Sequence, residues 1–209
     1  MRVVLFGSTG RTGLLLAAQA VREGHEVTAF ARDPSRLTIS HRRLRAVRGD
    51  VLEAPSVDRA MEGQEAVFST LGTRALDSRP VLSQGIRHIL DAMVAHDVPR
   101  LICLSAAGAL REDAGYSVGN LGLRLARLVV PGVYREHRRM LEEIRRHDVK
   151  WIVVRPVLLT DGPRTGQYRV AVEGIPRWGL RISRADVADF MIKQLTTEEY
   201  IHKMPAIGY

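Results

Sequence analysis

Short apolar runs alternate with longer amphipathic stretches along most of this chain. Runs of four or five aliphatic or aromatic residues, bounded by glycine, proline or charged residues, are typical of buried strands. This pattern predicts strands at residues 3–6, 26–30, 66–69, 101–104 and 151–154. Apolar positions at helical spacing predict helices at residues 14–22, 56–61, 80–94, 133–146 and 183–195. A weaker alternation at residues 167–172 predicts one further short strand.

Strands and helices therefore follow one another in turn, which is typical of a parallel sheet covered by helices on both faces. The predicted fold class is α/β, a Rossmann-type doubly wound parallel sheet. A length of 209 residues suits one such domain, so residues 1–209 are assigned to a single domain. The two stretches richest in Gly and Pro, residues 108–132 and 156–182, are expected to line the ligand crevice as substrate-side loops.

Three glycines with the spacing Gly7-x-x-Gly10-x-x-Gly13 separate the first predicted strand from the first predicted helix. The first allows a sharp turn, the second a close approach of the backbone to a pyrophosphate, and the third close packing of the helix. The helix N-terminus adds free N–H groups and a partial positive charge. The motif therefore predicts a dinucleotide pyrophosphate site on the loop Gly7, Ser8, Thr9, Gly10, Arg11, Thr12 and Gly13.

The end of the second predicted strand distinguishes NAD from NADP. An acidic residue there would bind a ribose 2′-hydroxyl and repel a 2′-phosphate. Here the strand is followed by Arg32, with Arg36 four residues on, and guanidinium groups match phosphate geometry. Arg11 is a further candidate for the same pocket, and Asp33 is expected to cap the turn. We expect NADPH/NADP as the cofactor, the alternative being that Arg32 and Arg36 are surface arginines.

Composition and charge restrict the classes of binding partner and the location expected for this chain. The formal net charge is +8, but the arginines are scattered rather than gathered into one stripe, which favours solvated faces and an anionic ligand over nucleic acid. No apolar run reaches the ~18 residues of a membrane span, and the N-terminal residues lack the pattern of a signal peptide. The single cysteine, Cys103, fits a reducing compartment. A cytoplasmic protein that binds neither nucleic acid nor membrane is expected.

Several motifs together resemble the biliverdin-IXβ reductase / flavin reductase group, NADPH-dependent atypical short-chain dehydrogenase/reductase proteins within the NAD(P)H-binding (NmrA-like) family. The resemblance spans nearly the whole chain. It rests on the glycine loop, Arg32-Asp-Pro-Ser-Arg36-Leu37, Gly49-Asp50-Val51-Leu52, Leu71-Gly72-Thr73-Arg74, Ser105-Ala106, Gly166-Gln167-Tyr168 and Leu195-Thr-Thr-Glu-Glu-Tyr200. The chain departs from the group at Leu158, where the group has a histidine, and this substitution makes the crevice more apolar.

The resemblance implies roles for residues that the motifs alone do not assign. Asp50 and Val51 would flank the adenine, and Leu71, Gly72, Thr73 and Arg74 would line the path from adenosine to nicotinamide. Ser105 would lie beside the nicotinamide, whose ring the segment Pro156, Val157, Leu158 and Leu159 would face. The group reduces flavins (FMN, FAD or riboflavin) and linear tetrapyrroles by hydride transfer, usually as a monomer.

The residues themselves offer few catalytic groups. Ser105 ends the fourth predicted strand on the ligand side, either as a catalytic residue that orients the nicotinamide or acceptor, or as a turn former. Tyr134-x-x-x-Arg138 is the nearest match to the Tyr-x-x-x-Lys of classical short-chain dehydrogenases, which disfavours alcohol–ketone chemistry. Cys103 is expected to pack inside its strand, and His137 and His147 to be solvated. No metal-ligand spacing is evident.

We therefore predict an NADPH-dependent oxidoreductase that acts on a small molecule, a flavin or a linear tetrapyrrole. With such an acceptor the main task of the protein is to align two flat rings, those of the nicotinamide and the acceptor, because the cofactor supplies the hydride. The alternative is an NADP(H)-sensing NmrA-like regulator that binds the cofactor without turnover. Work on a nucleotide sugar, as an epimerase or dehydratase, is weakened by the missing Tyr-x-x-x-Lys.

Overall fold

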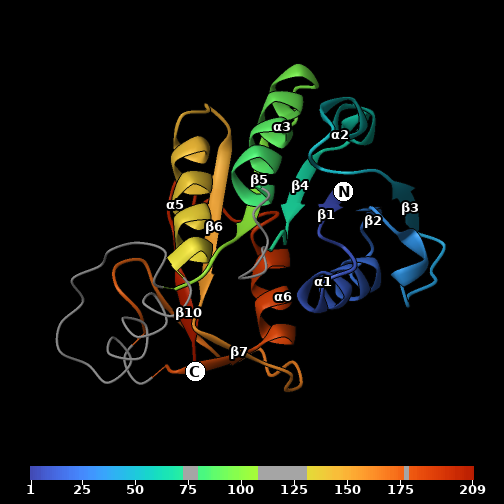
Figure 1. Cartoon of the computed structure of the whole chain (residues 1–209). Coiled ribbons are helices and arrows are strands. Elements are labelled where there is room, and N and C mark those ends of the chain that lie inside the picture. The colour runs from blue at the N-terminus through green and yellow to red at the C-terminus, as the bar shows by residue number, and fades with distance from the viewer. Residues whose placement is uncertain (73–79, 108–130, 177–178) are drawn as a thin grey trace.

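A computed structural model describes residues 1–72, 80–107, 131–176 and 179–209 of the chain (Figure 1). Its strands are β1 Arg2–Phe6, β2 Glu26–Ala31, β3 Leu44–Arg48, β4 Ala66–Ser69, β5 Arg100–Leu104, β6 Lys150–Pro156, β7 Leu158–Thr160, β8 Arg169–Ala171, β9 Arg181–Ser183 and β10 Ala206–Gly208. Its helices are α1 Arg11–Arg22, α2 Ala54–Met61, α3 Val81–Ala95, α5 Pro131–Arg145 and α6 Arg184–Lys193, with a 3₁₀ turn η1 at Pro34–Arg36.

Eight strands form one sheet in the order β3-β2-β1-β4-β5-β6-β10-β8. All neighbours in it are parallel except β10 and β8, which pair antiparallel. The strand order reverses between β1 and β4, the point at which doubly wound sheets bind their ligands. A separate parallel pair joins β7 to β9. The predicted Rossmann-type fold is confirmed.

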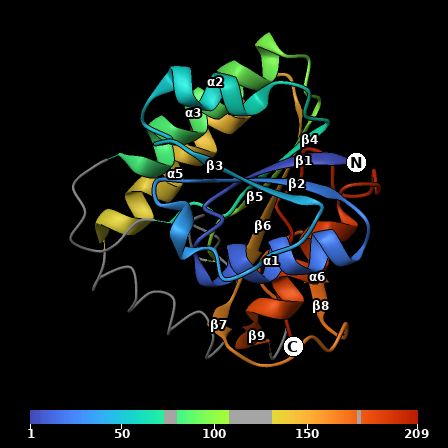
Figure 2. The same ribbon diagram turned by 90° about the vertical axis from the view of Figure 1, so that its right-hand side faces the viewer.

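Helices cover both faces of the sheet, as Figure 2 shows edge-on: α2, α3 and α5 lie on one face, and α1 with α6 on the other. Each face has its own apolar core, because alternate side chains of every central strand point to opposite sides. In β1, Val4 and Phe6 belong to the core under α3, while Val3 and Leu5 belong to the core under α1 and α6.

The five strands and five helices expected from apolar spacing are all present, as is the short strand near residue 170. Four strands were not predicted: β3, β7, β9 and β10. β3 has no continuous apolar run, because it is an edge strand with exposed residues at three of its five positions. The other three have three residues each, so only their pairing with distant segments makes them strands.

Residues 156–182, expected as one substrate-side loop, contain β7, β8 and the start of β9, whereas residues 108–130 of the other loop lie outside the described part. The buried carboxylate of Asp186 holds the middle of this segment, at Thr165 and Gly166. It accepts hydrogen bonds from the backbone N–H groups of Thr165 and Gly166, both at 2.8 Å, and from the Tyr209 hydroxyl at 2.6 Å. Among the described residues, no helix has the length and apolar character needed to span a bilayer.

Candidate functional site

The carboxyl ends of four neighbouring strands meet at the edge of the sheet where its order reverses. Gly7 follows β1, Arg32 follows β2, Thr70 follows β4 and Ser105 follows β5. Each of these residues belongs to, or directly adjoins, a segment that the sequence selected as a site. The parallel topology therefore collects them at one edge, where ligands of doubly wound proteins bind.

The loop from Gly7 to Gly13 is built so that only glycine fits at two of its positions. Gly7 has φ +80°, and a Cβ there would lie 2.6 Å from the carbonyl oxygen of Thr70. A Cβ on Gly13 would lie 2.2 Å from the carbonyl oxygen of Gly7, so α1 begins directly against the end of β1. The loop is also tied to β2, because the buried Ser8 hydroxyl donates to the Phe30 carbonyl at 2.9 Å.

The N-terminus of α1 presents an anion site at this loop. Gly10 is the N-cap, no side chain caps the helix, and its first turn has no acidic residue. The first N–H groups of a helix have no partner within it and carry the positive end of its dipole. Gly10 is exposed and Thr9 is half-buried, whereas Thr12 is buried. The cradle fits a pyrophosphate, with the backbone around Gly10 as its open side.

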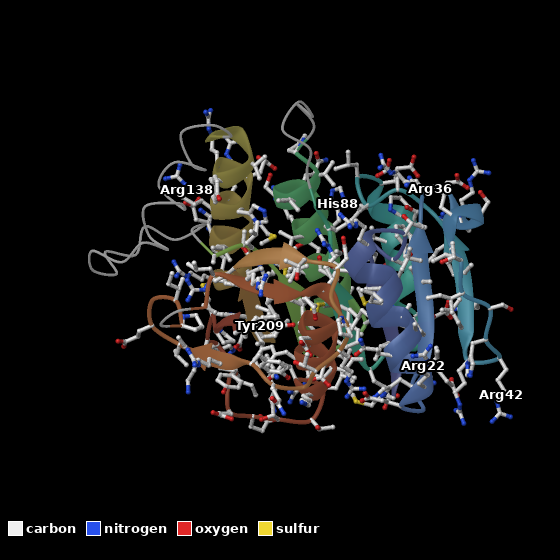
Figure 3. All side chains as sticks on the ribbon, turned by 90° about the horizontal axis from the view of Figure 1, so that it is seen from below. Arg22, Arg36, Arg42, His88, Arg138 and Tyr209 are labelled. Carbon is white, nitrogen blue, oxygen red and sulfur yellow. The ribbon has the colours of Figure 1, made fainter. Side chains whose placement is uncertain are left out.

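Two arginines expected to bind a 2′-phosphate, Arg32 and Arg36, are both exposed beyond the end of β2 (Arg36 is labelled in Figure 3). Within the described residues, neither has a carboxylate within 4.0 Å. Asp33 lies between them and caps η1, as expected: it accepts from the Ser35 N–H at 3.2 Å and the Ser35 hydroxyl at 2.6 Å. The Ser35 hydrogen bond holds the pKa of Asp33 below its ordinary value.

A third arginine at this place, Arg48, was missed in the sequence. It ends β3, where it pairs with Ala31 at the end of β2, and its charge also acts on Asp33. The sequence does place Arg48 between Val47 and the Gly49-Asp50 turn, as expected at the end of a strand. It was not assigned to the site because β3 was not predicted as a strand. The pairing of β3 with β2 thus adds Arg48 to the exposed arginines at the end of β2.

Arg11 does not join these arginines. Its guanidinium instead pairs with the carboxylate of Asp161, which also accepts from Arg184 at 2.7 Å. Asp161 follows β7 and Arg184 begins α6, so Arg11 points from the phosphate loop toward the β7 side of the edge. In this structure a carboxylate 150 positions away pairs with Arg11, and the role of Arg11 toward a 2′-phosphate stays a prediction.

Four of the residues expected to follow the adenosine, at positions 50, 51, 71 and 72, are described by the structure. The Asp50 carboxylate accepts from the Leu52 N–H at 3.0 Å and so shapes the turn after β3. Val51 is buried against Gly85 of α3, and Leu71 is half-buried in the same core. Gly72 is exposed at the edge. Thr73 and Arg74 lie outside the described residues.

The Ser105 hydroxyl has a buried partner, His137. The Oγ of Ser105 lies 3.1 Å from Nδ1 of His137, and the two residues are 6% and 8% exposed. The prediction that His137 is solvated is wrong. His137 shares the inner stripe of α5 with Met140, Leu141 and Ile144, all buried, and this i, i+3, i+4, i+7 spacing was the signal that could have placed it.

Burial lowers the pKa of His137 to about 4, although the nearby Glu136 carboxylate works in the opposite direction. The imidazole is therefore neutral at ordinary pH. His147, by contrast, is partly exposed, and its Nδ1–H donates to the Glu143 carbonyl at 3.0 Å. Cys103 is buried, as expected, and burial raises the pKa of its thiol to about 12, so it is not a nucleophile.

The four residues expected to face the nicotinamide differ in how much of each is exposed to solvent. Pro156 and Val157 are buried, and Leu159 packs partly against the core under α6. Leu158 is 70% exposed. Its N–H donates to the carbonyl of Leu180 at 3.3 Å, and Leu180 is 55% exposed, so two segments joined by a backbone hydrogen bond each present an exposed apolar residue.

Comparisons with known proteins agree with this geometry. The reductase pytE of Aspergillus terreus is 25% identical to the chain over 260 residues, covering 99% of this chain and 97% of the relative. A short-chain dehydrogenase/reductase of Veillonella parvula, solved in complex with NADP, has a TM-score of 0.83 at 18% identity, covering 100% and 94% of the two chains. An anaerobillin reductase of Escherichia coli has a TM-score of 0.80 at 20% identity, covering 99% and 96%.

The two solved structures are 18% and 20% identical to this chain, so they show a shared fold. A family model, in contrast, is matched by the sequence of the chain. The model for NAD(P)H-binding proteins matches residues 7–198, from the first glycine of the phosphate loop to the tail after α6. This chain belongs to the NAD(P)H-binding family.

Proposed function

We propose that the chain is an NADPH-dependent reductase that transfers a hydride to a flavin or a linear tetrapyrrole. The observation that carries this proposal is the edge at which Gly7–Gly13, the arginines after β2 and Ser105 meet. The relative named as a reductase, which matches over nearly its whole length, supports the oxidoreductase class.

The choice of NADPH rests on charge. The exposed guanidinium groups of Arg32, Arg36 and Arg48 surround the end of β2, and Asp33 is turned onto Ser35. Three guanidinium groups favour a phosphate dianion over a ribose hydroxyl. The pyrophosphate would lie on the backbone of Gly10 and Thr12 at the start of α1. When bound, the cofactor supplies the hydride for the reaction.

The acceptor is proposed from the exposed apolar residues just past the end of β6, the strand next to β5. Leu158 and Leu180 present apolar side chains there, on two segments joined by a hydrogen bond. A flat conjugated ring covers such a surface and removes it from water. The protein's part is then to align the acceptor with the cofactor, and residues 156–182 supply one wall.

The choice of a conjugated acceptor over a simple ketone rests on the acid–base groups present. Reduction of a ketone needs a proton donor of suitable pKa at the new alkoxide. The structure places the Ser105 hydroxyl and the neutral imidazole of His137 at the end of β5, and Tyr134 lies half-buried one turn before His137 on α5, with an arginine rather than a lysine four residues on. A flavin or tetrapyrrole spreads the new negative charge over its ring system and can take its proton from water.

The test is NADPH oxidation, followed by absorbance, with FMN, FAD, riboflavin and biliverdin offered in turn. Each assay is paired with one lacking protein, so that nonenzymatic reduction is subtracted. Turnover of any of these acceptors supports the proposal and identifies the substrate class. Tight NADPH binding without turnover of any acceptor contradicts it and favours the NADP(H)-sensing regulator.

A further inference from the structure

His137 and Ser105 form a buried polar pair at the edge where the acceptor is proposed to bind. They come from α5 and from the end of β5, which are 32 positions apart in the sequence. α5 lies directly over β5: the Cys103 sulfur of β5 is 3.8 Å from the Met140 sulfur of α5. His137 is one turn closer than Met140 to the N-terminus of α5, which places its ring at the end of β5.

The imidazole ring has little freedom in this place. It is 8% exposed and lies in the same stripe as Met140, Leu141 and Ile144, which pack into the core under α3 and α5. The preceding Glu136 is anchored as well, because its carboxylate accepts from the Ser83 hydroxyl of α3 at 2.9 Å. A ring fixed by packing gives its hydrogen-bonding partner a fixed direction.

A serine hydroxyl has one proton, and its direction is set by whichever partner it meets. Nδ1 of His137 is the only side-chain atom found to bond the Ser105 hydroxyl among the described residues. The backbone of Ser105 is held too, since its N–H donates to the Val154 carbonyl at 2.8 Å. The hydrogen bond to His137 thus determines what the hydroxyl can still offer: its lone pairs if Nδ1 accepts the Ser105 proton, or that proton and one lone pair if Nδ1–H donates.

We infer that His137 is a positioning residue: it fixes the direction of the Ser105 hydroxyl, through which Ser105 binds the nicotinamide amide or the acceptor. His137 acts only through Ser105 and gives no proton to the acceptor. This inference rests on the proposed reductase function for its kinetic test. The relation between the two side chains can be tested without turnover.

The kinetic test compares Ser105→Ala, His137→Leu, His137→Asn and the double variant Ser105→Ala/His137→Leu. Loss of one neutral hydrogen bond corresponds to about a threefold to tenfold fall in kcat. We expect that fall in Ser105→Ala and in His137→Leu, and no further fall in the double variant. The asparagine amide reaches the position of Nδ1, so His137→Asn should recover most of the kcat. His147→Asn, beyond the end of α5, is the control and should leave kcat unchanged.

Two results would overturn the inference. Independent losses that multiply in the double variant would mean that His137 acts on the substrate or on the fold, not through Ser105. A fall in wild-type kcat on raising the pH, absent from His137→Asn, would mean that an imidazolium donates the proton. Unfolding temperatures of all variants show whether a loss reflects folding instead.

The test without turnover is ¹⁵N NMR of the histidine side chains, with the His137 signal assigned from its absence in His137→Asn. We expect wild-type His137 to be a neutral, single tautomer at neutral pH, and Ser105→Ala to give a mixture of tautomers. An unchanged His137 spectrum in Ser105→Ala would overturn the inference. If no acceptor is reduced, the proposed function fails, and this spectrum still decides whether the two side chains are coupled.

Discussion

The backbone of Gly13 lies against the carbonyl group of Gly7, so closely that a Cβ on Gly13 would be 2.2 Å from the carbonyl oxygen. Real Cβ atoms do not approach an oxygen at that distance, and the blocking atom is backbone rather than a flexible side chain. The start of α1 and the end of β1 are therefore locked together, and this contact gives the phosphate loop its shape.

Replacing Gly13 with alanine should consequently displace α1 from β1. We expect a loss of about 1–3 kcal/mol in the free energy of unfolding, as for other overpacked positions, and NADPH binding weakened at least tenfold. Gly10→Ala is the comparison, because its Cβ would meet only the Gly7 carbonyl, at 3.2 Å. It should fold with near-normal stability yet bind NADPH more weakly. Calorimetric titration and urea unfolding measure both effects. Equal stability of the two variants would contradict this interpretation of Gly13.

Arg48 should share the 2′-phosphate with Arg32 and Arg36. A hydrogen bond to a charged group contributes about 1.5–3 kcal/mol, so Arg32→Ala and Arg48→Ala should each weaken NADPH binding by about tenfold to a hundredfold. NADH binding should change little. The measurement is the dissociation constant of each cofactor at a fixed ionic strength.

Arg42→Ala serves as the charge-matched control for these variants. Arg42 precedes β3, at the opposite end of the strand from Arg48 and far from Arg36 in Figure 3. It should leave the ratio of NADPH to NADH affinity unchanged. If Arg48→Ala behaves like Arg42→Ala, Arg48 does not contact the phosphate.

The buried His137 should make the protein less stable in acid. Its pKa is lowered from 6.5 to about 4 in the folded chain, so the unfolded chain binds a proton more readily between these values. The stabilisation is present above about pH 6.5 and is lost as the pH falls toward 4, on the order of 3 kcal/mol in all.

This acid sensitivity is measured by urea unfolding of wild type and His137→Asn across that range. The two curves of unfolding free energy against pH should converge as the pH falls, because asparagine does not titrate. Parallel curves would show that His137 is not buried as a neutral imidazole. Carboxylates such as Asp186 and Asp189, whose pKa values are lowered by their hydrogen bonds, are common to both proteins and cancel in the difference.

Asp186 should matter more for stability than any exposed ion pair. Burial works to raise its pKa, but hydrogen bonds from Tyr209, Gly166 and Thr165 outweigh burial and lower it. Asp186→Ala leaves those donors without an acceptor, and we expect a loss of about 3–5 kcal/mol. Tyr209→Phe removes a single donor and should cost about 1–2 kcal/mol. Thermal or urea unfolding checks the order. A smaller loss in Asp186→Ala than in Tyr209→Phe would contradict it.

The local pattern of the sequence determined the main architecture and the cofactor loop. Apolar runs located β1, β2, β4, β5 and β6, because central strands of a parallel sheet are buried on both faces. The three glycines identified the turn from β1 into α1. Gly13 must be glycine because of its contact with Gly7, which lies only six residues earlier, so this requirement is visible in the local sequence. The position of Ser105 followed from the same pattern.

Only the tertiary structure decided which distant side chains meet at that edge. Arg48 lies beside the end of β2 because β3 pairs with β2, and Arg11 pairs with Asp161, which follows β7 far along the chain. His137 has a polar side chain on an arginine-rich helix, a composition that favours exposure, whereas its spacing with Met140 and Ile144 favours the core. Its burial was decided by the packing of α5 over β5. Such contacts depend on the order of strands in the sheet, which is a long-range property that no short segment contains.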